Sequence, residues 1–288
     1  MDYKDKELIV IAGPTAVGKT SHAIELAKKY NTEILSADSR QFYRELQIGT
    51  AAPTNEELDA APHHFIGNLS IHDYYNVSIY EQEALVLIDK LFQKHDKIIV
   101  VGGSGLYIDA LCYGIDDLPD ADDNLRNEIK RKFSEEGIEF LQREVARLDP
   151  EFYKIVDQSN HKRLQRALEV CLATGKTYSS QRSNKRRSRP FKIRKIVLNM
   201  ERELLYNRIN ERVDKMMKAG LLEEVRSLQE YRDLNALKTV GYTELFRYLD
   251  GDISLEQAVT DIKTNSRRYS KRQVTWFKRY DDFEWIIL

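Results

Sequence analysis

The sequence predicts an α/β fold in which helices wind around a parallel sheet, with an all-helical domain inserted into it. Short apolar runs of strand length alternate with amphipathic segments over residues 1–113 and again over residues 191–288. Between them, residues 114–190 carry helical periodicity and no strand pattern. With 288 residues the chain is long enough for one to two domains with a substantial core. We therefore expect a core formed by 1–113 plus 191–288 and a helical insertion formed by 114–190.

The first predicted strand leads into a glycine-rich loop. The apolar run from Leu8 to Ala12 is followed by the pattern G-x-x-x-x-G-K-[ST] and then by residues with helical spacing. The loop comprises Gly13, Pro14, Thr15, Ala16, Val17, Gly18, Lys19 and Thr20. A strand, a glycine loop and a helix in this order predict a P-loop and a P-loop NTPase-like core, whereas a chance glycine turn is the alternative.

A P-loop binds a di- or triphosphate through backbone N–H groups at the positive end of a helix dipole. Lys19 adds a charge for the phosphates, and the hydroxyl of Thr20 is suited to ligate Mg²⁺. Most such proteins cleave the γ-phosphate bond of a nucleotide. On this motif alone, an ATP-binding kinase or NTPase is the first expectation.

The other predicted core elements follow in order. Residues 33–38 form a second strand, residues 78–93 a helix, and residues 98–101 a buried strand that enters Gly102–Gly105. A strand at 195–200 precedes a long amphipathic helix, and Ser254 begins the last helix with a capping-box pattern. Ligands of parallel sheets bind at the carboxyl ends of the strands, so residues 13–20, Asp38 and 102–105 should surround one crevice.

The insertion carries three apolar stripes at helical spacing, with a break at Asp149-Pro150 and a helix C-cap at Gly175. The stripes are Leu125, Ile129 and Phe133; Ile138, Leu141, Val145 and Leu148; and Leu164, Leu168, Cys171 and Leu172.

Charge is unevenly distributed although the net charge is only −1. Eight basic residues lie between Arg182 and Lys195, Lys185 among them, and seven lie between Lys263 and Arg279, with no acidic residue in either run. Such runs indicate a polyanionic partner, and a solvated face is the alternative.

We expect no membrane span, no signal peptide and, with two cysteines outside any C-x-x-C pattern, no zinc site or disulfide. A cytoplasmic location fits this pattern.

Asp38 ends the second predicted strand opposite the P-loop, and three roles remain open for it. It can serve as a general base, as an outer-sphere partner of Mg²⁺, or as the cap of the next helix. The sequence contains no Asn-Lys-x-Asp guanine motif and no apolar run ending in Asp-Glu. Their absence argues against a GTPase and against an ABC or AAA ATPase.

Seven motifs in order resemble the bacterial tRNA dimethylallyltransferase family, over nearly the whole chain. They are residues 13–20, 36–43, 48–51, 62–64, 101–107, 163–170 and 240–242. The family more often has Thr where Ser104 stands, and the zinc-finger extension of eukaryotic relatives is absent. The resemblance implies transfer of a dimethylallyl group from dimethylallyl diphosphate to N6 of adenosine 37, with pyrophosphate as the leaving group.

The resemblance also implies roles for individual residues. Asp38 is the base that deprotonates N6, Ser104 orients it or N6, and Arg208 with Arg212 reaches the diphosphate held by the P-loop, with Mg²⁺ on Thr20. Contacts to the tRNA anticodon stem–loop are implied for Asp38, Ser39, Arg40, Gln41, Ser104, Arg126, Arg163, Gln165, Arg166, Lys238, Gly241 and Tyr242. The insertion and the two basic runs would clamp the stem–loop through its phosphates, since such contacts need no sequence readout.

Some expectations stay open at this stage. His63 and His64 are more often structural than catalytic residues in such a position. An ATP-dependent small-molecule or nucleoside kinase of the P-loop type is the rival reaction, and a non-catalytic RNA-binding module is a second rival. No obligate protein partner and no membrane partner is expected.

Overall fold

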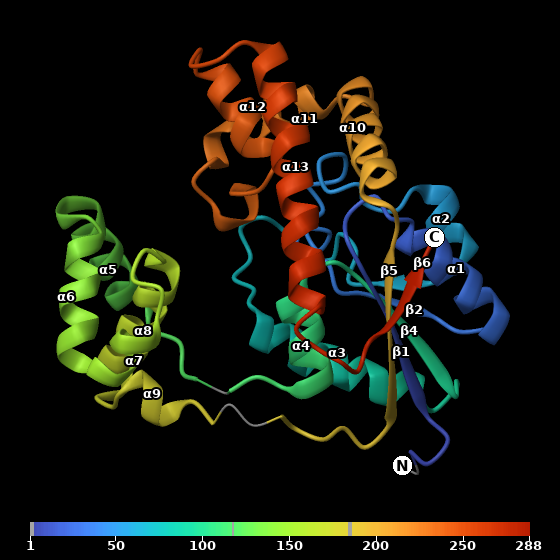
Figure 1. Ribbon diagram of the computed structural model, residues 1–288, viewed down its shortest axis with the longest axis horizontal. Helices are drawn as coiled ribbons and strands as arrows, with labels where there is room; N and C mark the ends of the chain where they lie inside the picture. The colour runs from blue at the N-terminus through green and yellow to red at the C-terminus, as the bar shows by residue number, and fades with distance from the viewer. Residues whose placement is uncertain (1–2, 117, 184–185) are drawn as a thin grey trace. The chain divides into compact units, whose positions relative to one another are not determined.

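The computed structural model describes residues 3–116, 118–183 and 186–288 and divides the chain into two compact units (Figure 1). One unit comprises Met1–Tyr113 and Ser188–Leu288, and the other comprises Gly114–Arg187. The sequence placed the second boundary at 190/191, three residues later. Across the described residues, none of the helices combines the length and the apolar character needed to cross a membrane.

The first unit is built on six parallel strands in the order β3-β2-β4-β1-β5-β6. Their bounds are β1 Glu7–Ala12, β2 Ile34–Ser36, β3 His63–His64, β4 Lys97–Val101, β5 Lys192–Asn199 and β6 Glu284–Ile287. The predicted parallel α/β sheet is confirmed. The two edge strands β3 and β6 were missed from the sequence. They contain only two and four residues, respectively, which is too short for a periodic pattern to be recognised.

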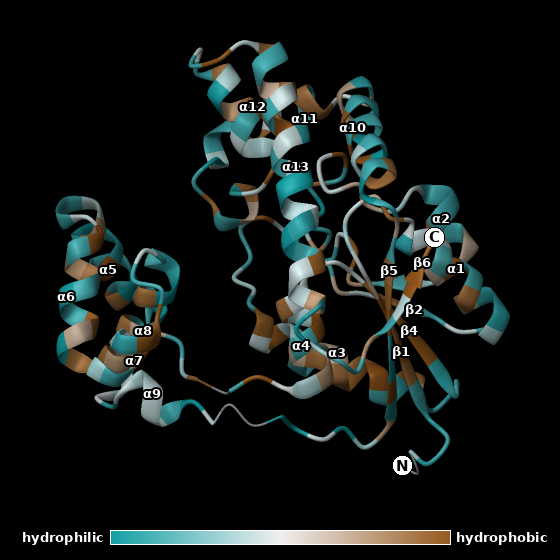
Figure 2. Cartoon of the chain, in the orientation of Figure 1, coloured by the Kyte–Doolittle hydropathy of each residue, from teal (hydrophilic) through white to brown (hydrophobic). Residues whose placement is uncertain are grey.

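Alternate side chains of β1 serve two different cores, one on each face of the sheet. Leu8 and Val10 pack with α3 (Val77–Leu91) and α4 (Gly105–Tyr113). Ile9 and Ile11 pack with α1 (Lys19–Tyr30) and α10 (Arg202–Lys218). The central strands β1 and β4 are therefore apolar over most of their length (Figure 2), which is typical of a parallel sheet covered on both faces.

A third apolar cluster lies beyond the carboxyl ends of the strands, between α10 and the C-terminal helices. These are α11 Leu221–Ser227, η1 Gln229–Tyr231, η2 Asn235–Leu237, α12 Tyr242–Leu249 and α13 Leu255–Phe277, and the short α2 Asn55–Ala60 precedes β3. Ser254 caps α13 by accepting a hydrogen bond from the Gln257 N–H at 3.1 Å, as its pattern predicted. This cluster forms the far wall of the crevice described below.

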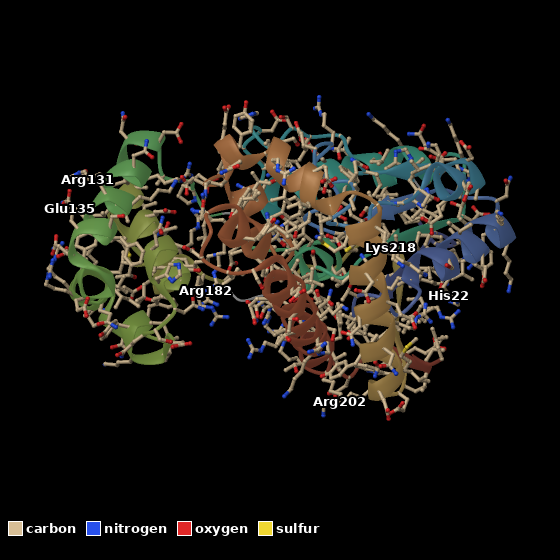
Figure 3. The ribbon with its side chains drawn as sticks, turned by 90° about the horizontal axis from the view of Figure 1, so that it is seen from above. His22, Arg131, Glu135, Arg182, Arg202 and Lys218 are labelled. Carbon is tan, nitrogen blue, oxygen red and sulfur yellow. The ribbon has the colours of Figure 1, made fainter. Side chains whose placement is uncertain are left out.

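Among the described residues of the second unit, every regular element is a helix: α5 Asp123–Glu136, α6 Ile138–Leu148, α7 Pro150–Ile155, α8 His161–Thr174 and α9 Tyr178–Gln181. The predicted stripes meet in its core except at the end of the third one, where Cys171 is buried outside this cluster. Leu172 is 44 % exposed, because it lies on the outer side of α8. The surface is rich in charge, with Arg131 and Glu135 paired at 2.8 Å along α5 (Figure 3).

Asp149 is the buried polar anchor of this unit. Its carboxylate accepts from the Phe152 N–H at 3.0 Å, which caps α7, and from both the N–H and the hydroxyl of Ser179 at 2.6 and 2.8 Å. The side chain is fully buried. The residue that ends α6 therefore also joins α7 to α9, where the sequence indicated only a break in the helix.

Replacing Asp149 by Ala should lower the free energy of unfolding of the insertion by about 3 kcal/mol, since it removes a cap and leaves buried donors unpaired. The matched control is Asp122→Ala, which removes the exposed cap of α5 and should cost about 1 kcal/mol. Urea unfolding followed by circular dichroism measures both. Equal losses in the two variants would contradict the anchoring role of Asp149.

Candidate functional site

A cavity of about 670 Å³ lies at the carboxyl ends of the strands in the first unit. Its walls come from the loops after β1 and β2, from residues 49–51, and from the inner faces of α10 and α13. Parallel strands all deliver their following loops to the same edge of a sheet, so segments far apart in sequence meet there. Residues of the P-loop, Asp38 and Gly102 line the cavity, which matches the crevice expected from the sequence.

The P-loop has the backbone shape that its glycines allow. Gly13 has φ +144°, and a Cβ there would lie 2.4 Å from the carbonyl oxygen of Leu198 in β5. Gly18 has φ +106° and precedes the first residue of α1. The loop thus lies against the neighbouring strand and turns directly into a helix N-terminus, which is an anion-binding geometry.

Lys19 is held inside this loop. Its Nζ donates to the carbonyl oxygen of Pro14 at 2.8 Å. Burial lowers the pKa of Lys19 to about 8, with the nearby Arg212 acting in the same direction and Asp38 opposing them. Because burial destabilises the charged form of Lys19, an anion that binds beside it raises this pKa and favours the protonated lysine.

Two arginines of α10 add to this positive charge. Arg208 lies over the loop, its guanidinium nitrogen being 3.7 Å from where a Cβ of Gly18 would be. Arg212 donates to the carbonyl oxygen of Thr50 at 3.3 Å, and burial lowers its pKa while Asp38 and Glu57 oppose that shift. The structure therefore brings Lys19, Arg208 and Arg212 to one cavity, as the resemblance implied.

Asp38 faces the cavity from the loop after β2. One carboxylate oxygen accepts from the Arg40 N–H at 3.0 Å, so the aspartate also shapes its own turn. Ser104 does not bond the carboxylate: its hydroxyl accepts from the Ser39 N–H at 2.9 Å and donates to the Ser39 hydroxyl at 3.1 Å. Ser104 is only 9 % exposed, and through these two hydrogen bonds it fixes Ser39, the residue that follows Asp38.

Tyr269 of α13 extends this network, and sequence reasoning missed it. Its hydroxyl lies near Ser104, and burial together with the charge of Asp38 raises the pKa of Tyr269 to about 12. The tyrosine therefore stays a neutral hydrogen-bonding group. No local pattern marks it, because it stands within a run of basic residues.

Arg40 and Gln41 line the cavity, and the NH groups of their side chains donate to backbone carbonyl oxygens. Arg40 donates to the carbonyl oxygens of Asn235 and Ala236 at 2.8 and 3.2 Å. Gln41 donates to the carbonyl oxygen of Ala51 at 3.0 Å. These contacts tie the loop after β2 to the walls on either side of it.

Lys238 and Gly241 also line the cavity, whereas Tyr242 lies behind its wall. The ring of Tyr242 is fully buried and its hydroxyl donates to Glu224 at 2.6 Å. Glu224 in turn accepts from the N–H groups of Gln47, Ile48 and Gly49 at 3.1, 2.8 and 3.0 Å. A Cβ at Gly49 would lie 2.5 Å from the Tyr242 ring. In this structure the Tyr242 side chain shapes the 47–51 loop, and Glu224, also missed from sequence, orders that loop.

The predicted tRNA-contacting residues of the insertion belong to the second unit. Arg126 pairs with Asp123 at 3.0 Å, Arg166 pairs with Asp120 at 2.9 Å, and Gln165 donates to Glu169 at 2.9 Å. Arg163 is exposed in the first turn of α8.

The first basic run is not one continuous surface, which corrects the expectation that the whole run faces phosphates. Arg189 is a buried ion-pair partner of Glu81 at 2.6 Å and binds carbonyl oxygens at the end of α4. Arg194 is paired with Glu284 at 2.7 Å. Lys185 lies outside the described residues. The second run does reach the cavity, through Arg272.

His63 and His64 make contacts that hold the edge of the sheet. His63 Nδ1 lies 2.7 Å from the carbonyl oxygen of Ala61, and His64 Nε2 lies 2.6 Å from Glu33. Burial lowers the pKa of His63.

The described residues include no group of three or more His, Cys, Asp or Glu side chains that could hold a metal ion. Thr20 does line the cavity at the start of α1. A single hydroxyl fits Mg²⁺ only together with phosphate oxygens and water, which is the usual arrangement for this ion.

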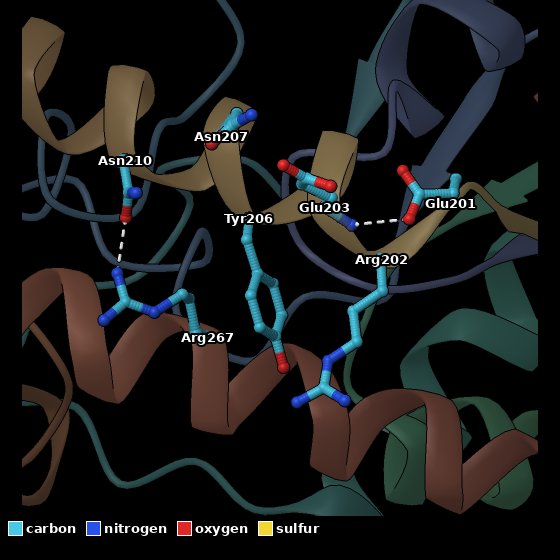
Figure 4. Close-up of a pocket in the computed structure, with 7 residues that line it drawn as sticks. All are labelled: Glu201, Arg202, Glu203, Tyr206, Asn207, Asn210 and Arg267. Carbon is cyan, nitrogen blue, oxygen red and sulfur yellow. Dashed lines mark hydrogen bonds between the residues drawn. The ribbon is translucent and has the colours of Figure 1, made fainter.

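A second hollow of about 430 Å³ lies along α10 and α13 (Figure 4). It is lined by Glu201, Arg202, Glu203, Tyr206, Asn207, Asn210 and Arg267. Arg267 crosses it to donate to Asn210 at 2.6 Å. Its mixed charges carry no excess of either sign, so the cavity at the P-loop remains the candidate site.

Several known proteins are similar to this chain over nearly its whole length. A family model described as IPP transferase matches residues 41–280. A tRNA dimethylallyltransferase 1 of Bacteroides thetaiotaomicron is 52 % identical over 97 % of this chain and 91 % of its own length. A tRNA dimethylallyltransferase of Cytophaga hutchinsonii is 48 % identical over 99 % of this chain and 94 % of its own length.

Solved structures are similar as well. The tRNA isopentenylpyrophosphate transferase from Bacillus halodurans has a TM-score of 0.71 and 37 % identity, covering 99 % of this chain and 90 % of that one. A eukaryotic dimethylallyltransferase acting on tRNA has a TM-score of 0.79 and 26 % identity, covering 98 % of this chain and 74 % of that one. The family predicted from the motifs is confirmed, and the chain belongs to the IPP transferase family.

Proposed function

We propose that this protein transfers the dimethylallyl group of dimethylallyl diphosphate to N6 of adenosine 37 in the anticodon loop of tRNA, releasing pyrophosphate. The observation that carries the proposal is one cavity in which a P-loop, two arginines and a carboxylate face each other. The names of relatives about 50 % identical to the chain support the same reaction.

The leaving group occupies the P-loop half of the site. When the bond between C1 and the diphosphate oxygen breaks, its electron pair stays on pyrophosphate. Lys19, Arg208 and Arg212 surround that position together with the backbone of residues 13–20. Charges fixed in a buried site stabilise a developing anion without reorganising, which is usually the largest contribution to such catalysis.

The nucleophile occupies the half of the site that contains Asp38. The lone pair of N6 is delocalised into the adenine ring, so the nitrogen attacks C1 well only if its proton is removed as the new bond forms. Asp38 accepts that proton. Ser104 keeps the Asp38 loop in place through its hydrogen bonds with Ser39.

An adenine stacked in an anticodon loop cannot reach a cavity, so the base is flipped out of the stack on binding. Arg40, Gln41, Lys238 and Gly241 line the route into the site. Exposed cations, including Arg163 in the insertion and Arg272 on α13, bind the stem–loop phosphates. The reaction takes place in the cytoplasm, where charged and uncharged tRNA circulates.

Mg²⁺ is part of this proposal, with the Thr20 hydroxyl as the protein ligand. When bound there with the diphosphate, the ion would neutralise negative charge on the leaving group. An ATP-dependent kinase is the alternative reaction for such a loop. The transferase names of the relatives favour the prenyl transfer over it.

One assay tests the proposal directly. The protein is incubated with Mg²⁺, labelled dimethylallyl diphosphate and an anticodon stem–loop that carries adenosines at positions 36 and 37. Label should enter the RNA at position 37, with no consumption of ATP. The proposal fails if the RNA stays unlabelled while label from the γ-phosphate of ATP reaches an acceptor.

Replacing Asp38 by Asn should lower the single-turnover transfer rate by about 10²–10⁴-fold, because a carboxamide cannot take the proton of N6. The amide oxygen still accepts from the Arg40 N–H, so the affinity for the stem–loop should stay nearly unchanged. Asp59→Asn, an exposed position on α2, is the matched control and should keep the full rate. A loss of RNA binding in proportion to the loss of rate would contradict the role of Asp38 as base.

Lys19 should make diphosphate affinity depend on pH near pH 8. Because its pKa is lowered to about 8, the free protein carries the charge below that pH and loses it above. Affinity for pyrophosphate should therefore fall as pH rises from 7 to 9. Lys19→Arg keeps its charge over this range, so the ratio of its affinity to that of wild type should grow by up to about tenfold. Calorimetric titration measures the pyrophosphate affinity of both proteins at each pH. If the affinities of the two proteins changed with pH in the same way, Lys19 would not be the group that causes the pH dependence.

A further inference from the structure

Gln273 of α13 joins two loops of the site with a single amide group. Its carbonyl oxygen accepts from the Thr15 N–H of the P-loop at 2.9 Å. Its nitrogen donates to the carbonyl oxygen of Gly103, in the loop after β4, also at 2.9 Å. The side chain is 5 % exposed and forms part of the cavity wall. Since an amide is planar and rigid, these two bonds fix the separation of Thr15 and Gly103.

The loop after β4 is shaped to receive this side chain. A Cβ at Gly103 would lie 2.2 Å from the amide nitrogen of Gln273, so only glycine leaves room for the bond. The same holds one turn along, where a Cβ at Gly105 would lie 2.2 Å from the indole ring of Trp276. Gly103 and Gly105 thus fit the loop closely against α13.

The same face of α13 reaches the acceptor half of the site. Tyr269 lies one turn before Gln273 and near Ser104, whose hydroxyl accepts a hydrogen bond from the Ser39 N–H. Gln273 therefore stands between the loop that binds the leaving group and the segment that positions Asp38. Its side chain is uncharged. Its hydrogen bond with the Thr15 N–H is present in the protein without any ligand.

We propose that Gln273 is a positioning residue that keeps the diphosphate loop and the Ser104 loop in fixed register, so that C1 of the prenyl donor lines up with N6 of adenine. The inference rests on the proposed function and assigns a specific task within it. Its effect is on alignment rather than on binding, because each reactant keeps its own contacts. A misplacement of about 1 Å between reacting groups costs about 10²-fold in rate.

Two substitutions test the bridge. Gln273→Met has a similar length but makes neither hydrogen bond, and Gln273→Asn keeps the amide but is too short to reach both loops. Each should lower the single-turnover rate at saturating substrates by about 10- to 100-fold. The dissociation constants for pyrophosphate and for the stem–loop should change by less than about threefold.

Gln257→Met is the matched control. Gln257 lies on the same helix, is exposed, and donates its amide to Asp261 at 2.8 Å. This variant should keep the full rate. A purely structural role of Gln273 would lower the melting temperature and leave the rate of the folded protein unchanged. A wild-type single-turnover rate in Gln273→Met, measured well below its melting temperature, would therefore overturn the proposal.

A second measurement needs no catalysis. Hydrogen exchange is followed with pyrophosphate and Mg²⁺ in the absence of RNA. In the wild-type protein, pyrophosphate should slow exchange at residues 13–20 and, through the bridge, at residues 102–107. In Gln273→Met the protection at 102–107 should be lost while that at 13–20 remains. Equal protection in both proteins would refute the bridge, whereas a wild-type protein that transfers no prenyl group would refute the proposed function instead.

Discussion

The concentration of positive charge at the end of the sheet is the constraint on which the site depends. Lys19, Arg208 and Arg212 line one cavity together with the acids Asp38, Glu57 and Glu211. Burial disfavours the charges of Lys19 and Arg212, whose pKa values are lowered. The fold can hold such a cluster because the loop after β1 and the start of α10 are anchored on adjacent parallel strands. A polyanion with two phosphates relieves this unfavourable arrangement.

Glycines bring main-chain segments close together around the cavity. Gly13 approaches the Leu198 carbonyl, Gly102 approaches the Ala37 carbonyl, and Gly49 lies against the ring of Tyr242. At each of these positions a side chain would have to displace main chain or a buried ring. The loops can therefore come close enough for single side chains to bridge them, as Glu224 does for residues 47–49.

The sequence predicted those parts of the fold and site that have local signals. The P-loop, the strand before Asp38 and the last helix each combine a periodic pattern with turn or cap residues, and each is present in the structure. Gln273, Tyr269 and Glu224 escaped detection because their partners lie far away in sequence, 258 residues in the case of Gln273 and Thr15. The position of Tyr242 shows the same limit. A motif marked the residue, but only the packing revealed that its side chain faces the core.

The carboxylate and the cations of the site are electrostatically coupled, which bears on the order of events in the proposed reaction. In the free protein Asp38 raises the pKa of Lys19 and opposes the lowering of that of Arg212. It thus serves as a counter-charge for the cluster. When Asp38 takes the proton of N6, that counter-charge disappears at the moment at which the broken bond leaves its electrons on pyrophosphate. The cations then interact with the leaving group alone. In the proposed reaction, proton transfer to Asp38 on one side of the cavity would therefore strengthen anion stabilisation on the other.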